Sequence, residues 1–359
     1  MDNYSTKFTV GMDLGDKHHK ITILDGQGNV SEKNTCINTA KHVQDFFRRF
    51  STPSEVTVGM ESGTHSPWLS RLLEEMGFRI LVGNARKLRA IWQSDVKDDS
   101  RDSIMLARIA RFDPSLLYPI HHRGKKAQAH LAVLRARDAL VSGRTALINT
   151  CRGLVKSWGS RLPLCSADAF AKTVIDSVPE ELHMAVMPVI KQIGEMTQRI
   201  RAYDKRLEEI SSREYPETAI LSQIQGVGPV TSLAFVLTVE DPQRFTKNRS
   251  IGPFLGLTPK RDQSGETDKE LPITKAGDEF LRRLLTNSAQ FILGPFGPDC
   301  DLRRHGERIL RKGGKASKKK AVTAVSRKLA VRLMHLWKTG ETYEPFHKQT
   351  KKQKKNNAA

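Results

Sequence analysis

Short apolar runs alternate with helical patterns over the first third of the chain. Helical spacing of apolar residues predicts one helix from about Pro67 to Met76 and another from about Ser100 to Arg111, which Asp113-Pro114 ends. Four runs rich in β-branched and other apolar residues predict strands: Phe8–Leu14, Lys20–Leu24, Val56–Met60 and Phe78–Val82. Strands that alternate with helices predict an α/β layer built on a substantial sheet.

Residues 125–212 carry a seven-residue repeat of apolar positions. The repeat includes Leu134, Val141, Ile148 and Val155, and later Val186, Val189, Ile193, Met196, Ile200, Tyr203, Leu207 and Ile210. Steps of three and four are typical of a coiled-coil seam, and Pro188 predicts that the second helix begins or kinks nearby. Prolines between 159 and 181 interrupt the pattern, so we expect two long helices joined by a loop. Pairing within one chain and pairing between chains both stay open.

Residues 216–340 predict a mainly helical block. Apolar patterns predict helices at 219–224 and 230–239, then near 276–293 and 318–337, with a polar loop at 260–270. The first two helices flank the tight turn Gly226-Val227-Gly228-Pro229, whose glycines allow backbone amides to approach a phosphate closely. A purely structural turn is an equally good interpretation of that motif alone.

Composition excludes several classes of protein. The 359 residues are 38% hydrophobic and include 25 glycines, enough for real cores and for two or three domains. No run approaches the roughly 18 apolar residues of a membrane span, and the N-terminus lacks the layout of a signal peptide. The four cysteines are far apart in sequence, so we expect neither a zinc site nor a disulfide framework, and a reducing cytosol fits.

The charge is strongly positive and unevenly distributed. The chain has 59 Lys and Arg against 39 Asp and Glu, and residues 301–359 hold 18 of the former against four of the latter. This excess favours a nucleic-acid partner, because cationic side chains that neutralise phosphates release counterions. We assign that role to residues 303–320, whereas residues 348–359 fit a solubilising tail equally well.

Four carboxylates are candidates for a metal site. Asp13 lies late in the first predicted strand and Glu61 ends another, while Asp99 and Asp102 share one face at the head of a helix. Carboxylates are the ligands that Mg²⁺ prefers, and two such ions can stabilise the attacking and leaving oxygens at a phosphorus.

Other interpretations of these carboxylates stay open from spacing alone. Acidic residues at a helix start also favour the helix dipole, and the neighbouring Asp95 and Asp98 prevent spacing from selecting one pair. Glu61 could be an ordinary loop residue. The Asp13-Leu14-Gly15 segment also occurs in the phosphate loops of actin-like ATPases.

The motifs taken together resemble one family over about residues 7–345. The chain is similar to the transposases of insertion-sequence family one-ten, the Asp-Glu-Asp-Asp recombinases that include pilin-gene-inverting enzymes. Ser103 stands where that family usually has alanine. The matching segments are Gly11-Met12-Asp13, Met60–Trp68, Lys97–Asp102, Met105-Leu106-Ala107, Gly226–Pro229, Gly256–Gly265 and Ile273–Gly277.

The resemblance implies a RuvC-like, ribonuclease-H-type domain in which Asp13, Glu61, Asp99 and Asp102 bind Mg²⁺ or Mn²⁺. It also implies a C-terminal transposase domain with Ser264 as nucleophile. Family members act as dimers or tetramers, so Ser264 would join the carboxylates of another subunit, with the coiled coil as dimer contact. They use a structured noncoding guide RNA that pairs with target and donor DNA. We expect such a protein at the nucleoid of the bacterial cytoplasm and not in a membrane.

Four segments follow from these patterns and the resemblance: the RuvC-like domain at 1–120, the long-helix arm at 121–215, the transposase domain at 216–345 and a basic tail at 346–359. Without the family, Ser264 beside Gly265 would be an ordinary turn residue. With it, we expect Ser264 to attack the scissile phosphate. The expected nucleic-acid contacts are Lys87, Arg89, Gly226, Gly228, Lys260, Arg261, Lys275, Arg282, Arg283, Lys318, Lys319 and Lys320.

Three alternatives compete with this hypothesis. A metal-only junction nuclease would be indifferent to Ser264 and would leave residues 216–340 without a chemical role. A non-enzymatic nucleic-acid scaffold would bind without cutting. An actin-like ATPase would need a second phosphate loop in a duplicated domain, and the nearest candidate, Asp25-Gly26-Gln27-Gly28, lies too close to the first.

Overall fold

The computed structural model describes residues 6–88, 99–264 and 267–346, although a few side chains next to the gaps, including those of Asp99 and Ser264, lie outside the description. The chain forms two compact units, Met1–Arg123 and Gly124–Ala359. Among the described helices none is both long and apolar enough to cross a bilayer.

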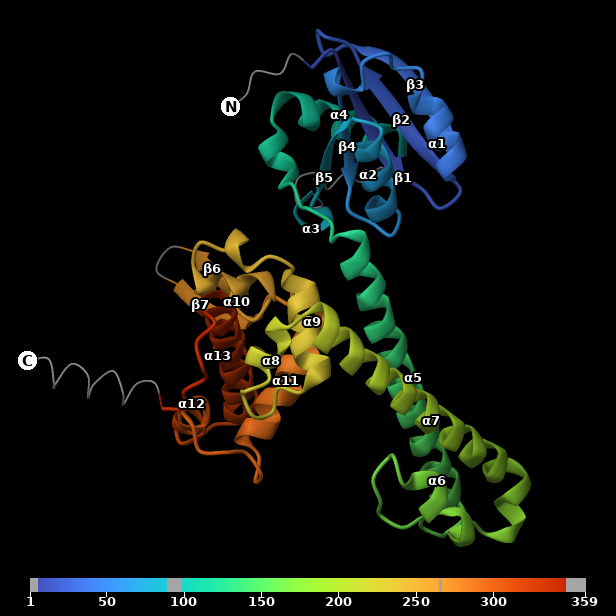
Figure 1. The fold of residues 1–359 in the computed structure, drawn as a ribbon, viewed down its shortest axis with the longest axis vertical. Helices are drawn as coiled ribbons and strands as arrows, with labels where there is room; N and C mark the ends of the chain where they lie inside the picture. Colours follow the sequence, from blue (N-terminus) through green and yellow to red (C-terminus); the bar gives the residue numbers. More distant parts are fainter. Residues whose placement is uncertain (1–5, 89–98, 265–266, 347–359) are drawn as a thin grey trace, which may run out of the picture. The chain divides into compact units, whose positions relative to one another are not determined.

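The described strands of the first unit form a mixed five-stranded sheet in the order β3-β2-β1-β4-β5 (Figure 1). These strands are β1 Phe8–Leu14, β2 His18–Leu24, β3 Val30–Ile37, β4 Val56–Glu61 and β5 Arg79–Gly83. β1 and β2 pair antiparallel, as do β2 and β3, whereas β1, β4 and β5 run parallel. The expected α/β layer is confirmed, and this arrangement is consistent with a ribonuclease-H-like domain.

Helices cover both faces of this sheet. They are α1 Ala40–Phe47, α2 Ser66–Glu75, α3 Ala85–Leu88 and α4 Asp99–Phe112. Val10 and Met12 on β1 share a core with Val43 and Phe47 of α1 and with Leu69 of α2. α4 packs on the opposite face, across β1, β2 and β4. Edge strand β3 and helix α1 were absent from the sequence prediction, because β3 is mostly polar and exposed.

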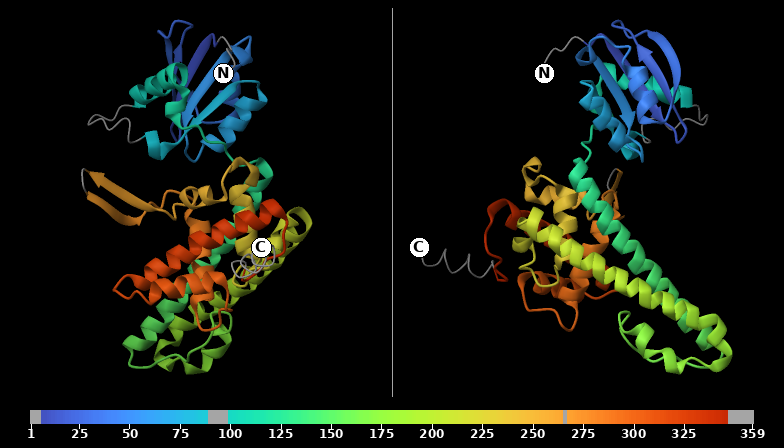
Figure 2. Two further views of the ribbon diagram at one scale, coloured as in Figure 1. Left: turned by 90° about the vertical axis from the view of Figure 1, so that its left-hand side faces the viewer. Right: turned by 45° about the vertical axis from the view of Figure 1, so that its right-hand side comes forward.

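Two long helices, α5 Lys125–Ser157 and α7 His183–Glu214, begin the second unit and pack along each other (Figure 2). The predicted pair of long helices is therefore present, and α7 begins five residues before Pro188. The contacts join two helices of one chain. A coiled coil that pairs two chains stays a prediction.

The second unit has two hydrophobic cores. The smaller one joins α6 Phe170–Thr173 to α5 and α7. The helices around the larger one are α8 Glu217–Leu221, α9 Pro229–Val239, α10 Ile251–Phe254, α11 Glu279–Leu293, α12 Asp301–Leu310 and α13 Ser317–Thr339. Residues 231–239 of α9 are all buried, which explains their nearly continuous apolar sequence.

The prediction of a polar loop at 260–270 is wrong. β6 Pro259–Ser264 and β7 Thr267–Ile273 form an antiparallel hairpin there. Backbone hydrogen bonds hold these strands together, and the side chains described on them are mostly exposed, so no buried face leaves an alternating apolar pattern in the sequence.

Candidate active site

Two of the candidate carboxylates lie at the same edge of the five-stranded sheet. Met12 of β1 pairs with Met60 of the parallel strand β4, so Asp13 and Glu61 follow at adjacent positions. Both side chains are half-buried. The carboxyl ends of neighbouring parallel strands thus bring together two residues that are 48 positions apart in the chain.

Glycines show which face of the sheet these carboxylates occupy. Gly11 and Gly59 pair with each other beneath α4. A Cβ atom on Gly11 would lie 2.0 Å from the carbonyl oxygen of Ser103, and one on Gly59 would lie 2.8 Å from the Cβ of Ala110. Since side chains alternate along a strand, Asp13 and Glu61 share the α4 face with these glycines.

The first turns of α4 are anchored on this face next to Asp102. The hydroxyl groups of Ser103 and Thr22, both buried, lie 2.8 Å apart and form a hydrogen bond. This pair accommodates a serine at position 103, because each buried hydroxyl satisfies the other. Asp102 is half-buried, and the side chain of Asp99 lies outside the described residues.

The residues of this edge suit a hard divalent cation in their donor chemistry, because they are carboxylates. Within the described part of the chain, no three His, Cys, Asp or Glu side chains come close enough to hold a metal ion. Asp13, Glu61 and Asp102 each take part in a polar interaction. The assignment of these residues as metal ligands stays a prediction.

Ser264 is the last residue of β6 and pairs with Thr267 across the hairpin. Its side chain lies outside the described residues. The exposed side chains of Lys260 and Arg261 lie on the same strand. Lys260 and Arg261 are therefore close to Ser264 in the chain, as predicted, although they lie on a strand and not in a loop.

At the base of this hairpin, the backbone before β6 packs closely against the backbone after β7. A Cβ atom on Gly256 would lie 2.3 Å from the amide nitrogen of Ala276, and one on Gly277 would lie 2.1 Å from the carbonyl oxygen of Phe254. The amide of Thr274 donates to the carbonyl of Thr258 over 2.9 Å. The two glycine-containing segments on either side of the hairpin therefore hold its base together through backbone contacts.

Five of the predicted nucleic-acid contacts line one groove of about 510 Å³ in the second unit. They come from the segment before α11, from α11 itself and from the start of α13: Lys275, Arg282, Arg283, Lys318 and Lys319. Glu279 lies in the same lining. Residues separated by more than 30 positions in sequence thus form one cationic surface, which we call the basic groove.

Two arginines of the basic groove also have structural partners. Arg282 donates to the carbonyl oxygens of Leu255 and Gly277. Arg283 forms an ion pair with Asp138 of α5 at 2.5 Å. Their charge contributes to the groove, but part of their hydrogen-bonding capacity is already used within the protein.

The lysines at the start of α13 are placed where a helix least favours cations. Lys318, Lys319 and Lys320 are exposed, and the first turn contains no acidic residue. The positive end of the helix dipole repels these ammonium groups. An anion bound there would be stabilised by the dipole and by the lysines together. By contrast, Arg303, from the same predicted basic segment, binds Glu307 and three backbone carbonyls and has a structural role.

The remaining predicted contacts are dispersed. Lys87 lies 3.8 Å above the ring of Tyr118 in the first unit, and Arg89 lies outside the described residues. Gly226 has a φ of +92°, and Gly228 precedes α9 as its N-cap residue.

One chemically notable residue of the first unit was missed. His19 is completely buried next to Leu14, and among the described residues neither of its ring nitrogens has a hydrogen-bond partner. Burial, followed by the charge of nearby His65, lowers the pKa of His19. β2 begins with the polar residues His18, His19 and Lys20, so nothing in its sequence indicated that His19 would be buried.

The five-stranded sheet is consistent with a ribonuclease-H-like domain, and comparisons with known proteins indicate a transposase. A family model described as a transposase, of the DEDD IS110 type, matches residues 10–158. A second, described as "Transposase IS116/IS110/IS902 family", matches residues 218–299.

Individual relatives carry the same description. A "Probable family 20 transposase" of Pseudomonas aeruginosa is 26% identical over 292 residues, which are 79% of this chain and 83% of that protein. The transposase of insertion sequence element IS1111A of Coxiella burnetii is 31% identical over 175 residues, 45% of this chain and 46% of that protein. The transposase of element IS1328 of Yersinia enterocolitica is 26% identical, over 78% and 82% of the two chains.

The chain is therefore a transposase of an insertion sequence. It belongs to the IS110/IS116 family, as its motifs predicted.

Proposed function

We propose that this transposase cuts and rejoins DNA through Ser264, assisted by divalent cations on Asp13, Glu61, Asp99 and Asp102, at sites chosen by a guide RNA. The observation that carries the proposal is the pair Asp13 and Glu61, adjacent beyond the Met12–Met60 pair on the face that α4 covers. Such an edge is well suited to holding cations against a phosphate.

The four carboxylates would hold Mg²⁺ or Mn²⁺, which would supply a Lewis acid that neutralises charge on the phosphate. Asp13 and Glu61 lie at strand ends of a covered sheet, and the anchored start of α4 carries Asp102. Rigid elements of this kind hold ligands more accurately than loops do.

Ser264 would form a bond from its Oγ to phosphorus while the bond from phosphorus to one sugar oxygen breaks. The serine loses its proton and the departing sugar oxygen gains one, so the phosphoserine ester conserves the bond energy for joining to a new strand. Lys260 and Arg261, exposed on the same strand, could stabilise the extra negative charge at the phosphorus.

The serine and the carboxylates belong to different compact units. This separation supports a composite site, in which Ser264 of one subunit meets the carboxylates of another within a dimer or tetramer. It also gives the second unit a chemical role, which a metal-only junction nuclease would not.

The net charge of +20 and the basic groove support simultaneous binding of RNA and DNA. Base pairing to the RNA would choose the target and donor sites, while the protein contacts backbone phosphates. Changing the pairing loops of the RNA should then redirect insertion with the protein unchanged. Insertion at the original sites would exclude guidance by the RNA.

The central experiment traps the covalent intermediate. The protein is purified with co-expressed RNA from its element and incubated with end-labelled DNA, and adducts are resolved by denaturing electrophoresis. Ser264→Ala and chelation by EDTA should each abolish the adduct, whereas Gln263→Ala, an exposed neighbour on the same strand, should retain it. Cleavage that persists in Ser264→Ala would instead identify a junction nuclease.

A further inference from the structure

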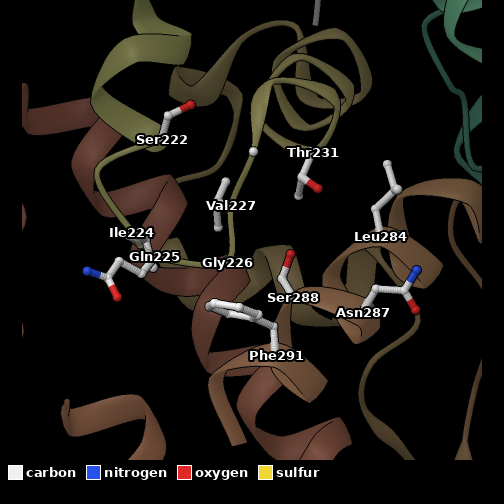
Figure 3. A pocket seen from close by; sticks show the side chains of 11 residues that line it. Ser222, Ile224, Gln225, Gly226, Val227, Thr231, Leu284, Asn287, Ser288 and Phe291 are labelled. Carbon is white, nitrogen blue, oxygen red and sulfur yellow. The ribbon is translucent and has the colours of Figure 1, made fainter. Parts of the chain in front are cut away.

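Two phenylalanines near the end of α11 are exposed in different ways. The ring of Phe291 lines a cavity of about 420 Å³ beside Gly226 (Figure 3). A Cβ atom on Gly226 would lie 2.8 Å from that ring, so Phe291 is packed into the fold. Phe296, in the loop between α11 and α12, is 86% exposed. Single exposed apolar residues are common, and exposure alone does not indicate a site.

The loop that carries Phe296 is held in place by one arginine. The Nη1 atom of Arg303 donates to the carbonyl oxygens of Gly294 and Gly297, on either side of Phe296, both over 2.8 Å. The Nε atom of the same side chain donates to Glu307 over 2.9 Å, which orients the guanidinium group. Because the backbone is bound on both sides of Phe296, the position of its exposed ring is fixed by the fold.

The sequence of the loop restricts its conformation further. Pro295 and Pro298 have fixed φ angles, and a Cβ atom on Gly297 would lie 2.2 Å from the carbonyl oxygen of Ile292. A rigid loop that presents an aromatic ring loses little conformational entropy when a partner covers the ring. This combination is typical of a binding anchor, whereas an incidental exposed residue needs no such support.

An arginine-rich groove adjoins the loop. Its volume is about 540 Å³, and four arginines and three acidic residues line it, with Asp299 from the loop among them. Asp299 pairs with Arg304 at 2.7 Å. Arg308 and Arg311 are exposed, and within the described part of the chain neither forms an ion pair. Two cations without an acidic partner therefore lie along the groove that begins at the loop of Phe296.

We propose that Phe296 stacks on an unpaired nucleobase while Arg308 and Arg311 contact the adjoining phosphates. Aromatic rings beside cationic side chains suit single strands, because each base has a π face and each phosphate a charge. The bases of a duplex are already stacked on each other, so the ring selects unpaired segments. The inference rests on the proposed function and deepens it, because a guide RNA that pairs with DNA requires unpaired bases on both molecules.

The test measures fluorescence anisotropy of the full-length protein with three labelled probes: a single-stranded DNA of about 15 nucleotides, an RNA of the same sequence and the DNA duplex. Phe296→Ala should weaken binding of at least one single strand about tenfold, the value of one stacked base, and leave duplex binding unchanged. Phe296→Trp should retain the affinity. Phe296→Leu, which is apolar but has no ring, should lose as much as Phe296→Ala.

Matched variants separate stacking from other effects. Phe112→Ala removes another phenylalanine, 69% exposed in the first unit, and should leave all three affinities unchanged. Arg308→Ala should reduce the slope of log K against log salt by about 0.7 for a single strand, whereas Phe296→Ala should lower affinity without altering that slope. A loss confined to the DNA strand or to the RNA identifies which of them supplies the base.

Unchanged affinity of Phe296→Ala for both single strands would overturn the inference, and so would an equal loss for the duplex or full affinity of Phe296→Leu. The serine mechanism is judged separately, by the covalent adduct of Ser264. An adduct together with unchanged single-strand binding in Phe296→Ala would reject this contact and retain the proposed function. A tenfold loss without any adduct would retain the contact and exclude the proposed chemistry.

Discussion

The two β-sheets of the molecule position their candidate catalytic residues in contrasting ways. The five-stranded sheet is covered on both faces, and its carboxylates sit at the ends of buried parallel strands. The β6–β7 hairpin is a two-stranded sheet that carries Ser264 and is anchored at its base by interlocked glycines. Under the function that we propose, the covered sheet would hold metal ions at a fixed edge, and the hairpin would carry the nucleophile on a separate support, suited to meeting the edge of another subunit.

The largest expected effect concerns the edge of the five-stranded sheet that carries Asp13 and Glu61. Asp13→Asn should lower DNA cleavage at least about a thousandfold, because a neutral amide holds a divalent cation poorly and several kcal/mol of charge stabilisation are lost. Cleavage of end-labelled DNA in the presence of the element's RNA measures this. Asp16→Asn is the matched control, since Asp16 lies just beyond the same strand with a side chain 93% exposed. Equal losses in both variants would contradict a specific role for Asp13.

The next effect tests how tightly the covered sheet is packed. Gly11→Ala should lower the free energy of unfolding by about 3 kcal/mol, because the new methyl group would collide with the backbone of α4 at Ser103. Urea denaturation followed by circular dichroism measures the loss. Gly63→Ala, where a Cβ atom would meet nothing within 4 Å, should change stability by less than about 0.5 kcal/mol. A tolerated Gly11→Ala would show that α4 can move away from β1.

The same contrast explains how much of the molecule could be predicted from its sequence. β1 and β4 were evident because their residues are mostly buried and apolar, and the carboxylate near the carboxyl end of each strand was evident with them. The hairpin was not, because backbone hydrogen bonds between exposed strands leave no pattern of apolar residues. The choice of Asp99 and Asp102 over Asp95 and Asp98 came from family resemblance, since spacing alone could not make it.

The basic groove shows a second limit of prediction from the sequence. Lys275 and Lys318 were each predicted as contacts, but tertiary packing alone brings them into one groove.

A smaller effect is expected at the base of the hairpin. Gly277→Ala should lower the free energy of unfolding by about 1–3 kcal/mol, because the new methyl group would collide with the backbone of Phe254. A shift of the hairpin can relieve part of this strain. Trypsin should then cleave faster after Lys260 and Arg261, as mass spectrometry of the fragments would show. Gly153→Ala, in open space on α5, should instead stabilise its helix slightly. Unchanged cleavage rates would mean that the interlocked glycines do not anchor the hairpin.

The smallest effect distinguishes the two units by their response to acid. The pKa values of His19 and His122, both in the first unit, are lowered chiefly by burial. The unfolded state therefore binds protons at a higher pH than the folded state, and the stability of this unit should decline as the pH falls below about 6.5, the ordinary histidine value. Hydrogen exchange followed by mass spectrometry should show faster exchange in β1 and β2 at pH 5.5 than expected from the intrinsic rates, with little change in α9 and α13. His19→Phe should remove much of this dependence without loss of stability at pH 7, because neither ring nitrogen has a hydrogen-bond partner to lose among the described residues. If His19→Phe retained the full acid response, the lowered pKa of His19 would not be its source, and His122 would become the residue to test.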